Sequence, residues 1–207
     1  GLRSVLLLKS TWVLDRADQL AKAETAEERR RLALPHRQEL ERLHPEAYYT
    51  AKEVRELPTT KLMTGQELLR VGSGSHAWMT PEHPDPEGQQ LLNLASVVRR
   101  AQRGELPSQQ GGEKDYKLAR LPSEFALFYD WCSLLQKGPD GTARTEAEQA
   151  AFGKALSTMQ LWYAHQQLFT ISLSKLPDGC EATPYMERGW PTVEMAWSML
   201  VKQNYMD

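Results

Sequence analysis

The sequence predicts an α/β protein in which a mostly parallel β-sheet is flanked by helices. Three short apolar segments have the length and composition of buried strands: the run that begins at Leu68, residues 125–130 and residues 168–174. Segments whose apolar residues have helical spacing separate them. Strands that alternate with helices are typical of a parallel sheet with right-handed crossovers. We therefore expect one main core, built on this sheet.

The sequence of the N-terminal part of the chain predicts short helices that are rich in charged residues. Residues 11–57 place leucines and tyrosines among many Glu and Arg residues, and Pro35 and Pro45 divide them into two or three short helices. This segment carries no convergent chemistry. We interpret residues 1–65 as a helical extension that packs on the main domain or on a protein partner, and residues 66–207 as the α/β domain.

Composition and charge exclude several classes of function. Because 25 basic residues face 27 acidic ones, no overall positive field attracts nucleic acid. The aliphatic run at residues 5–8 is too short to span a bilayer. The two cysteines cannot form a disulfide framework and lack the spacing of a metal site, which fits a reducing, cytoplasmic compartment. The chain starts with Gly rather than Met, which suggests a piece of a longer protein.

Polar and aromatic side chains follow the ends of two predicted strands. Ser75, His76 and Trp78 follow the first strand, where the Gly and Ser residues before them predict a turn. Asp130 ends the second strand, and Trp131 comes directly after it. Because the carboxyl ends of parallel strands meet at one edge of a sheet, where such sheets bind ligands, we expect these side chains to share a site.

The stretch 185–194 predicts a loop that leads into a helix. Gly189 suits a turn and Pro191 the first helical turn, so that the next turn carries Glu194 toward a cleft that aromatic residues close to water. Arg188 and Trp190 lie in the same stretch. The competing interpretation is an ordinary helix entry with a buried tryptophan and a solvated glutamate.

These segments resemble, in their order along the chain, the layout of heterokaryon-incompatibility-like (HET-like) domains, which are similar to the Toll/interleukin-receptor (TIR) superfamily. The likeness rests on residues 75–78, 84–86, 128–136, 159–163 and 185–194, and covers about residues 66–205. The resemblance implies a flavodoxin-like sheet and a signalling or defence context. In its active members it implies hydrolysis of the nicotinamide–ribose bond of NAD+, which is a substrate and not a cofactor.

In TIR-like domains the motif Trp-x-x-x-Glu carries the glutamate of the NAD-cleaving members, and Trp190 and Glu194 match that spacing. Cleavage passes through an oxocarbenium-like ribosyl cation, so one carboxylate that holds the ribose hydroxyls and stabilises this charge is sufficient. The resemblance thus implies that Glu194 is catalytic. Trp190 or Trp131 would flank the nicotinamide ring, Asp130 would bind a ribose hydroxyl, and Arg188 would meet phosphate.

The chain departs from the family pattern at two positions, which keeps two other functions open. Leu135 precedes Gln136 where the family has proline, and Met79 follows the first tryptophan of the site. The first alternative is a non-catalytic signalling and assembly domain that self-associates or binds a protein through the helical extension. The second is a nucleotide-binding or nucleoside-processing protein of the same fold.

Several candidate side chains have a structural interpretation beside the functional one. Trp190 is more typical of a buried anchor that fixes the direction of Glu194 than of a platform for a ligand. Arg188 could pair with a neighbouring glutamate. A single histidine such as His76 is more often a hydrogen-bonded structural residue, and Cys132 is expected to be a small buried residue.

Overall fold

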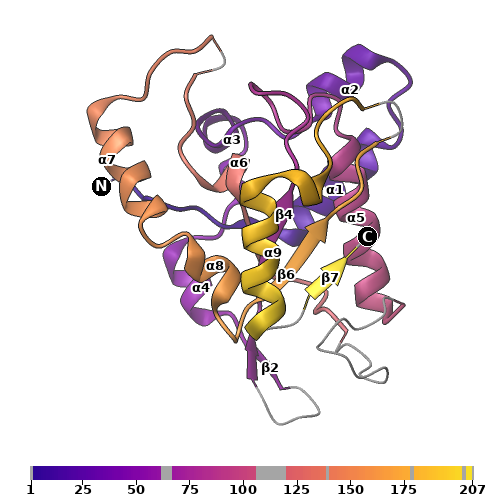
Figure 1. The fold of residues 1–207 in the computed structure, drawn as a ribbon, viewed down its shortest axis with the longest axis vertical. Helices are drawn as coiled ribbons and strands as arrows, with labels where there is room; N and C mark the ends of the chain where they lie inside the picture. The colour runs from indigo at the N-terminus through magenta and orange to yellow at the C-terminus, as the bar shows by residue number, and fades with distance from the viewer. Residues whose placement is uncertain are drawn as a thin grey trace.

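A computed structural model of the chain describes residues 2–61, 67–105, 120–138, 140–177, 180–201 and 204–206 (Figure 1). The helices are α1 (Ser10–Leu20), α2 (Ala26–Leu32), α3 (Arg37–Leu43), α4 (Ala51–Glu56), α5 (Gln89–Arg103), α6 (Asp130–Ser133), α7 (Glu146–Leu156), α8 (Gln160–Ala164) and α9 (Gly189–Val201), with the 3-10 turns η1 (Pro45–Ala47) and η2 (Tyr185–Glu187). The strands are β1 (Leu8–Lys9), β2 (Thr59–Lys61), β3 (Glu67–Leu69), β4 (Val71–His76), β5 (Ala126–Tyr129), β6 (Phe169–Leu173) and β7 (Asn204–Met206).

The main sheet has the strand order β1-β5-β4-β6-β7. Strands β5, β4, β6 and β7 are parallel to their neighbours, and the short β1 pairs antiparallel with the edge of β5. Numbered in chain order among themselves, the parallel strands run 2-1-3-4, which is compatible with a flavodoxin-like layout. The predicted class, a mixed α/β protein with a mostly parallel sheet flanked by helices, is confirmed.

Both faces of the sheet are covered, and the side chains of β5 alternate between them. Leu127 and Tyr129 lie in a core cluster with the buried faces of α1 and α5. Ala126 and Phe128 lie in a second cluster with residues of α7 and α8. This explains why the strand is apolar without interruption, because a strand buried on both faces has no side that water can solvate.

The predicted turn at residues 72–75 is wrong, because this segment forms the middle of β4. The two glycines leave room for neighbouring rings: a Cβ atom on Gly72 would overlap the ring of Phe169, and one on Gly74 would lie 2.7 Å from Cδ2 of Tyr129. Small residues here therefore permit close packing and are not a turn signal. The polar side chains of β6 are also buried, and the Thr170 hydroxyl lies 3.0 Å from that of Ser73.

The N-terminal segment packs on the α/β part and supplies its β1 edge. Residues of β1, α1 and α3 belong to the same core cluster as α5 and one face of the sheet. Buried hydrogen bonds hold the segment to α6: Tyr48 donates to the carbonyl of Cys132 at 2.7 Å, and the buried guanidinium of Arg37 donates to that of Ser133 at 3.2 Å. Within the ranges given above, no helix is long and apolar enough to cross a membrane.

Candidate functional site

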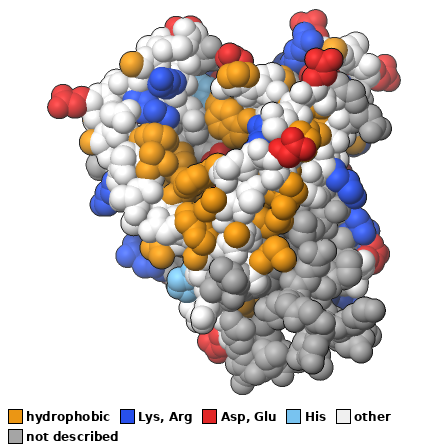
Figure 2. Space-filling view, in the orientation of Figure 1, with side chains coloured by type: hydrophobic (Ala, Val, Ile, Leu, Met, Phe, Trp, Pro, Cys, Tyr) orange, Lys and Arg blue, Asp and Glu red, His pale blue; other side chains and the backbone are white. Residues whose placement is uncertain are grey.

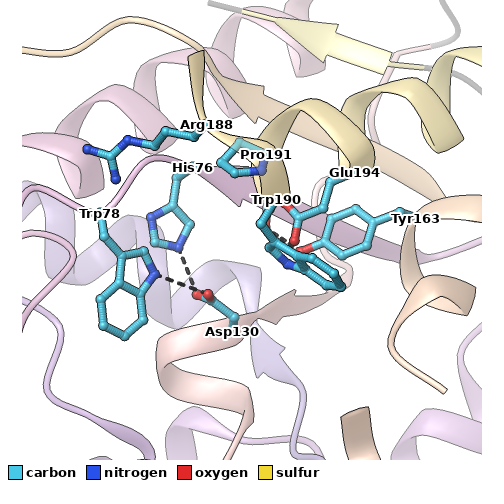
Figure 3. A pocket seen from close by; sticks show the side chains of 9 residues that line it. His76, Trp78, Asp130, Tyr163, Arg188, Trp190, Pro191 and Glu194 are labelled. Atoms are coloured by element: carbon cyan, nitrogen blue, oxygen red, sulfur yellow. Dashed lines mark hydrogen bonds and ion pairs between the residues drawn. The ribbon is translucent and has the colours of Figure 1, made fainter. Parts of the chain in front are cut away.

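A cavity of about 360 Å³ lies at the carboxyl edge of the sheet, beyond the ends of β4 and β5 and against α8 and the start of α9 (Figure 3). Its lining residues are Gly74, His76, Trp78, Asp130, Tyr163, Arg188, Trp190, Pro191 and Glu194. Six of the residues predicted from the sequence thus lie around one cavity. In Figure 3, Trp78 and Arg188 lie on the left, Trp190, Tyr163 and Glu194 on the right, and His76 and Asp130 between them.

Glu194 is a buried carboxylate that reaches the cavity from α9. The helix begins at Gly189, so Glu194 lies in its second turn, with only 3% of its surface exposed. The hydroxyl of Ser75 donates to Oε2 of Glu194 at 2.5 Å, and the phenol of Tyr185 lies 2.6 Å from the same hydroxyl. Ser75 is not among the residues that line the cavity, but its hydrogen bond fixes the position of the Glu194 carboxylate.

Burial raises the pKa of Glu194 to about 7, and the negative charge of Asp130 acts in the same direction. Hydrogen bonds from Ser75 and Tyr163, together with the positive charge of His76, oppose this rise in pKa. A carboxyl group with such a pKa changes its charge near neutral pH, which is typical of groups that take part in catalysis.

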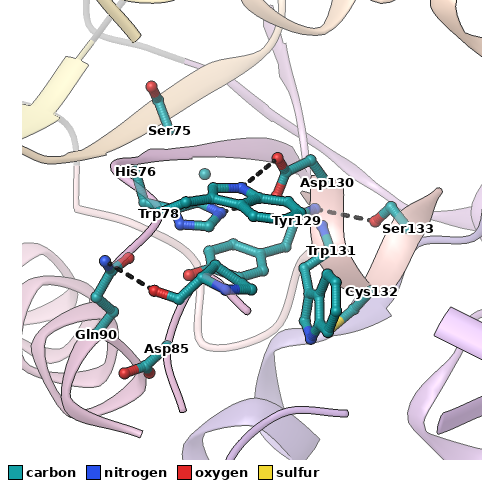
Figure 4. Close-up of polar contacts among 12 residues, drawn as sticks. Ser75, His76, Trp78, Asp85, Gln90, Tyr129, Asp130, Trp131, Cys132 and Ser133 are labelled. Carbon is teal, nitrogen blue, oxygen red and sulfur yellow. Dashed lines mark hydrogen bonds and ion pairs between the residues drawn. The ribbon is translucent and has the colours of Figure 1, made fainter. Parts of the chain in front are cut away.

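His76 has a hydrogen-bond partner, Asp130, that the sequence analysis did not identify. Its Nε2 lies 2.8 Å from Oδ1 of Asp130, whose other oxygen accepts the indole N–H of Trp78 at 3.2 Å (Figure 4). The imidazole also stacks on the ring of Tyr129, with centroids 4.2 Å apart. Burial lowers the pKa of His76, but the Asp130 carboxylate outweighs this and raises it above the ordinary value. Burial by itself would raise the pKa of Asp130, but His76 has the stronger, opposite effect. The pKa of Asp130 therefore lies below its ordinary value. The two side chains form an ion pair.

Trp190 is not the buried anchor that the sequence suggested, since 48% of its surface is exposed. The first turn of α9 projects it over the cavity, where its ring meets that of Trp197 edge to face at 6.1 Å. The anchor is Tyr185, which is 1% exposed and packs with Met195 and Ala77. Tyr185, to which the sequence analysis assigned no role, therefore takes the anchoring role expected of Trp190.

Arg188 extends along the cavity toward Trp78 (Figure 3). Its Nε donates to the carbonyl of Thr183 at 2.7 Å. Among the described residues it forms no ion pair, so the alternative pairing with Glu187 or Glu181 is not observed. Its guanidinium is placed to meet an anionic group of a bound molecule.

Trp131 does not line this cavity, which corrects its expected place beside a ligand ring at Glu194. Its indole N–H donates to the carbonyl of Leu34 at 2.9 Å, and the side chain is 5% exposed. The α6 turn that follows β5 directs Trp131 toward the N-terminal segment. Cys132 is fully buried as expected; burial, followed by the charge of Asp130, raises the pKa of its thiol. It is therefore not poised as a thiolate.

Tyr163 is the site residue that the sequence interpretation missed. It projects from α8, is 1% exposed, and donates to the carbonyl of Gly74 at 3.3 Å while supporting the Glu194 carboxylate. The sequence analysis included it only in the segment 159–163 of the family resemblance and gave it no role. No spacing in the sequence indicates that α8 packs against β4 and α9.

The cavity combines a carboxylate of raised pKa, a buried ion pair, two indole rings and a cationic side chain at one end. It can hold a polar molecule with an anionic part near Arg188 and a developing positive charge near Glu194. Within the described part of the chain, no group of three or more His, Cys, Asp or Glu side chains is arranged to hold a metal ion. Comparisons with protein families, with curated proteins and with solved structures find no match.

Proposed function

We propose that the chain is a TIR-like NAD+ glycohydrolase that cleaves the bond between nicotinamide and ribose. The observation that carries the proposal is the position of Glu194. This buried carboxylate, matched by the Trp-x-x-x-Glu spacing, lies in a cavity at the carboxyl edge of a parallel sheet. The strand order is compatible with the flavodoxin-like sheet that the resemblance implies.

The proposed reaction suits a site with one such carboxylate. As the bond between C1′ and the pyridinium nitrogen breaks, its electron pair neutralises the nicotinamide, which leaves without needing a proton. The ribosyl group becomes an oxocarbenium-like cation that ionised Glu194 stabilises. Water then adds to C1′ and releases one proton, which gives ADP-ribose. This chemistry requires Glu194 in its ionised form.

The other lining side chains have matching roles in this proposal. Trp190 flanks the nicotinamide ring in place of Trp131, since its indole is half exposed at the cavity. Asp130 already accepts hydrogen bonds from His76 and Trp78, so its main role is to hold these two side chains in position. The pKa of His76 is raised by the Asp130 carboxylate, and a protonated His76 favours the ionised form of Glu194. Arg188 meets phosphate.

The test is release of nicotinamide from NAD+ by the purified chain at high protein concentration. Wild type is compared with Glu194→Gln, which keeps the shape of the side chain and removes its charge. Loss of one electrostatic stabiliser of a transition state lowers the rate by about 100-fold or more. Glu187→Gln is the control, because Glu187 lies exposed in the preceding turn. Equal rates of nicotinamide release by wild type and Glu194→Gln refute the proposal. It is also refuted if wild type releases no nicotinamide under conditions in which the protein self-associates.

A second candidate function, assembly, has an observation of its own in its favour. Hydrophobic side chains gather on the surface over α8 and α9 (Figure 2). The exposed ones in this region are Leu161, Met186, Trp190, Val193 and Met199, each at least 38% exposed. Apolar patches of this kind on a protein surface often mark association sites. The patch lies on the helices beside the cavity, not on the N-terminal extension where the sequence suggested a contact.

Light scattering over a range of protein concentrations tests this candidate. We expect Met199→Glu and Leu161→Glu to reduce self-association, because a buried charge at an interface is unfavourable. Leu43→Glu is the control, since Leu43 is equally exposed but lies on α3. Assembly that is unchanged by all three substitutions excludes this surface.

A further inference from the structure

A second cavity, of about 300 Å³, is lined by residues that follow β4 and by residues that follow β5. Trp78, Trp131, Lys137 and Arg144 are among them. Of the described residues that line this cavity, only Trp78 also lines the cavity at Glu194. The cavity is therefore a separate site, and the proposed cleavage of NAD+ takes place outside it.

Two indole rings form walls of the second cavity, and both are held in position by contacts elsewhere. Trp78 and Trp131 meet edge to face, with ring centroids 5.3 Å apart and planes at 85° (Figure 4). The indole N–H of Trp131 donates to Leu34, and the ring of His83 packs on it with centroids 4.8 Å apart. The indole N–H of Trp78 donates to Asp130. A flat aromatic group can stack on one of these rings while its edge meets the other, and binding does not have to order either indole.

Arg144 is a fixed cation on the lining of the same cavity. Its Nε donates to the carbonyl of Leu135 at 2.7 Å, and its guanidinium carbon lies 3.6 Å from the centre of the Phe152 ring. Within the described ranges, its two terminal nitrogens have neither a hydrogen-bond acceptor nor a carboxylate at ion-pair distance. A pair of terminal guanidinium nitrogens matches the two oxygens of a carboxylate, so Arg144 is suited to bind one in bidentate fashion.

The charges around the second cavity favour an anion. Lys137 adds an exposed positive charge, and Glu82 is the one carboxylate among the described lining residues. The negative charge of Glu148 also acts on Arg144, but the Glu148 carboxylate is hydrogen-bonded to Thr145. The lining therefore carries two positive charges against one negative charge, which attracts an anionic ligand.

We propose that the second cavity binds a small aromatic carboxylate, with its ring against Trp78 and Trp131 and its carboxylate on Arg144. A neutral aromatic molecule leaves the charge of Arg144 without a partner, and a small inorganic anion leaves the two indoles without one. The volume of the cavity is near the lower limit for a small-molecule site, which suits a ligand with one ring system. The inference goes beyond the proposed function and does not rest on it.

The first experiment separates the two parts of the ligand. Phenylacetate, which has a ring and a carboxylate, is titrated into the wild-type chain by calorimetry. Phenylacetamide keeps the ring and removes the charge, and acetate keeps the charge and removes the ring. We expect phenylacetate to bind at least about tenfold more tightly than either. Equal affinity for phenylacetate and one of the two comparison molecules, or no binding of phenylacetate, overturns the inference.

Two substitutions on the lining test where the carboxylate binds. Arg144→Gln removes the bidentate cation and should weaken phenylacetate binding about tenfold or more. Lys137→Glu reverses an exposed charge and should weaken it about fivefold. Lys154→Glu is the matched control, because it makes the same reversal at an exposed lysine of α7 outside the cavity, and it should leave the affinity unchanged. Wild-type affinity in folded Arg144→Gln, or in Lys137→Glu, overturns the inference.

The indole N–H resonances in the NMR spectrum of the wild-type chain show which cavity the probe occupies. Phenylacetate should shift the resonances of Trp78 and Trp131. It should leave that of Trp12 unchanged, since Trp12 lies on α1 and lines neither cavity. Trp190 lines the cavity at Glu194 but not the second one. A shift of the Trp190 resonance without a shift of the Trp131 resonance places the probe in the cavity at Glu194 and overturns the inference.

Discussion

Replacing Glu194 with glutamine is expected to stabilise the protein at alkaline pH, although it abolishes the proposed activity. The carboxyl group is 3% exposed, and burial raises its pKa from the ordinary 4.5 to about 7. Because the pKa in the folded state is raised, the folded protein holds this proton more tightly than the unfolded chain. Ionisation of Glu194 therefore lowers stability progressively as pH rises from 4.5 to about 7.

The magnitude follows from the difference between the two pKa values. It corresponds to a cost of about 3 kcal/mol at pH 8 and about 1 kcal/mol at pH 5. Glutamine carries no charge and still accepts the hydrogen bond from Ser75, so it removes most of this cost. For a chain of this size the expected rise in Tm is about 6–12 °C at pH 8 and about 2–4 °C at pH 5.

Thermal unfolding of wild type and Glu194→Gln, followed between pH 5 and pH 8, measures the effect. The quantity of interest is the difference in Tm between the two proteins at each pH, because other titrating groups are common to both. Glu187→Gln is the control, because it makes the same substitution at an exposed carboxyl group in the preceding turn. A Tm difference for Glu194→Gln that does not grow with pH would contradict the burial argument.

Three further predictions follow from the same geometry. If ionised Glu194 stabilises the transition state, kcat/KM for NAD+ should rise with pH to a plateau with its midpoint near pH 7, and a flat profile would remove this role. Ser75→Ala removes the donor to Glu194, so the pKa should rise further and the midpoint of the pH–rate profile should move to higher pH; an unchanged midpoint contradicts the contact. Gly72→Ala places a methyl group against the ring of Phe169 and should lower the free energy of unfolding, measured with denaturant, by about 1–3 kcal/mol. Gly153→Ala is the control on a helix where the new Cβ atom meets open space, and it should raise the free energy of unfolding by about 0.5–1 kcal/mol. Equal effects of the two substitutions would refute the packing argument.

The features that the sequence predicted are those encoded within a few neighbouring residues. The apolar run before Asp130 predicted β5 and the position of that carboxylate, because a strand buried on both faces needs apolar residues at every position. The helix entry around Pro191 likewise predicted that a turn of helix carries Glu194. These predictions needed no knowledge of how distant segments pack.

The features that the sequence did not predict depend on packing between distant segments. Tyr163 enters the site because α8 lies against β4, and Trp131 leaves it because its indole reaches Leu34, which is 97 residues away. Small residues in β4 were interpreted as a turn because their partners, the rings of Phe169 and Tyr129, lie on other strands. Local pattern cannot distinguish a glycine needed for φ from one needed for space.

Ser75 and Glu194, which share a hydrogen bond, are far apart in the sequence, and this separation determines when during synthesis the site is complete. The two residues are 119 positions apart in the chain, and the ribosome makes β4, β5 and α8 before α9. A nascent chain that ends after α8 contains His76, Asp130 and Tyr163 but lacks Glu194, the carboxylate proposed to stabilise a ribosyl cation. Synthesis from the N-terminus therefore withholds the proposed activity until the helix that carries Glu194 has been made.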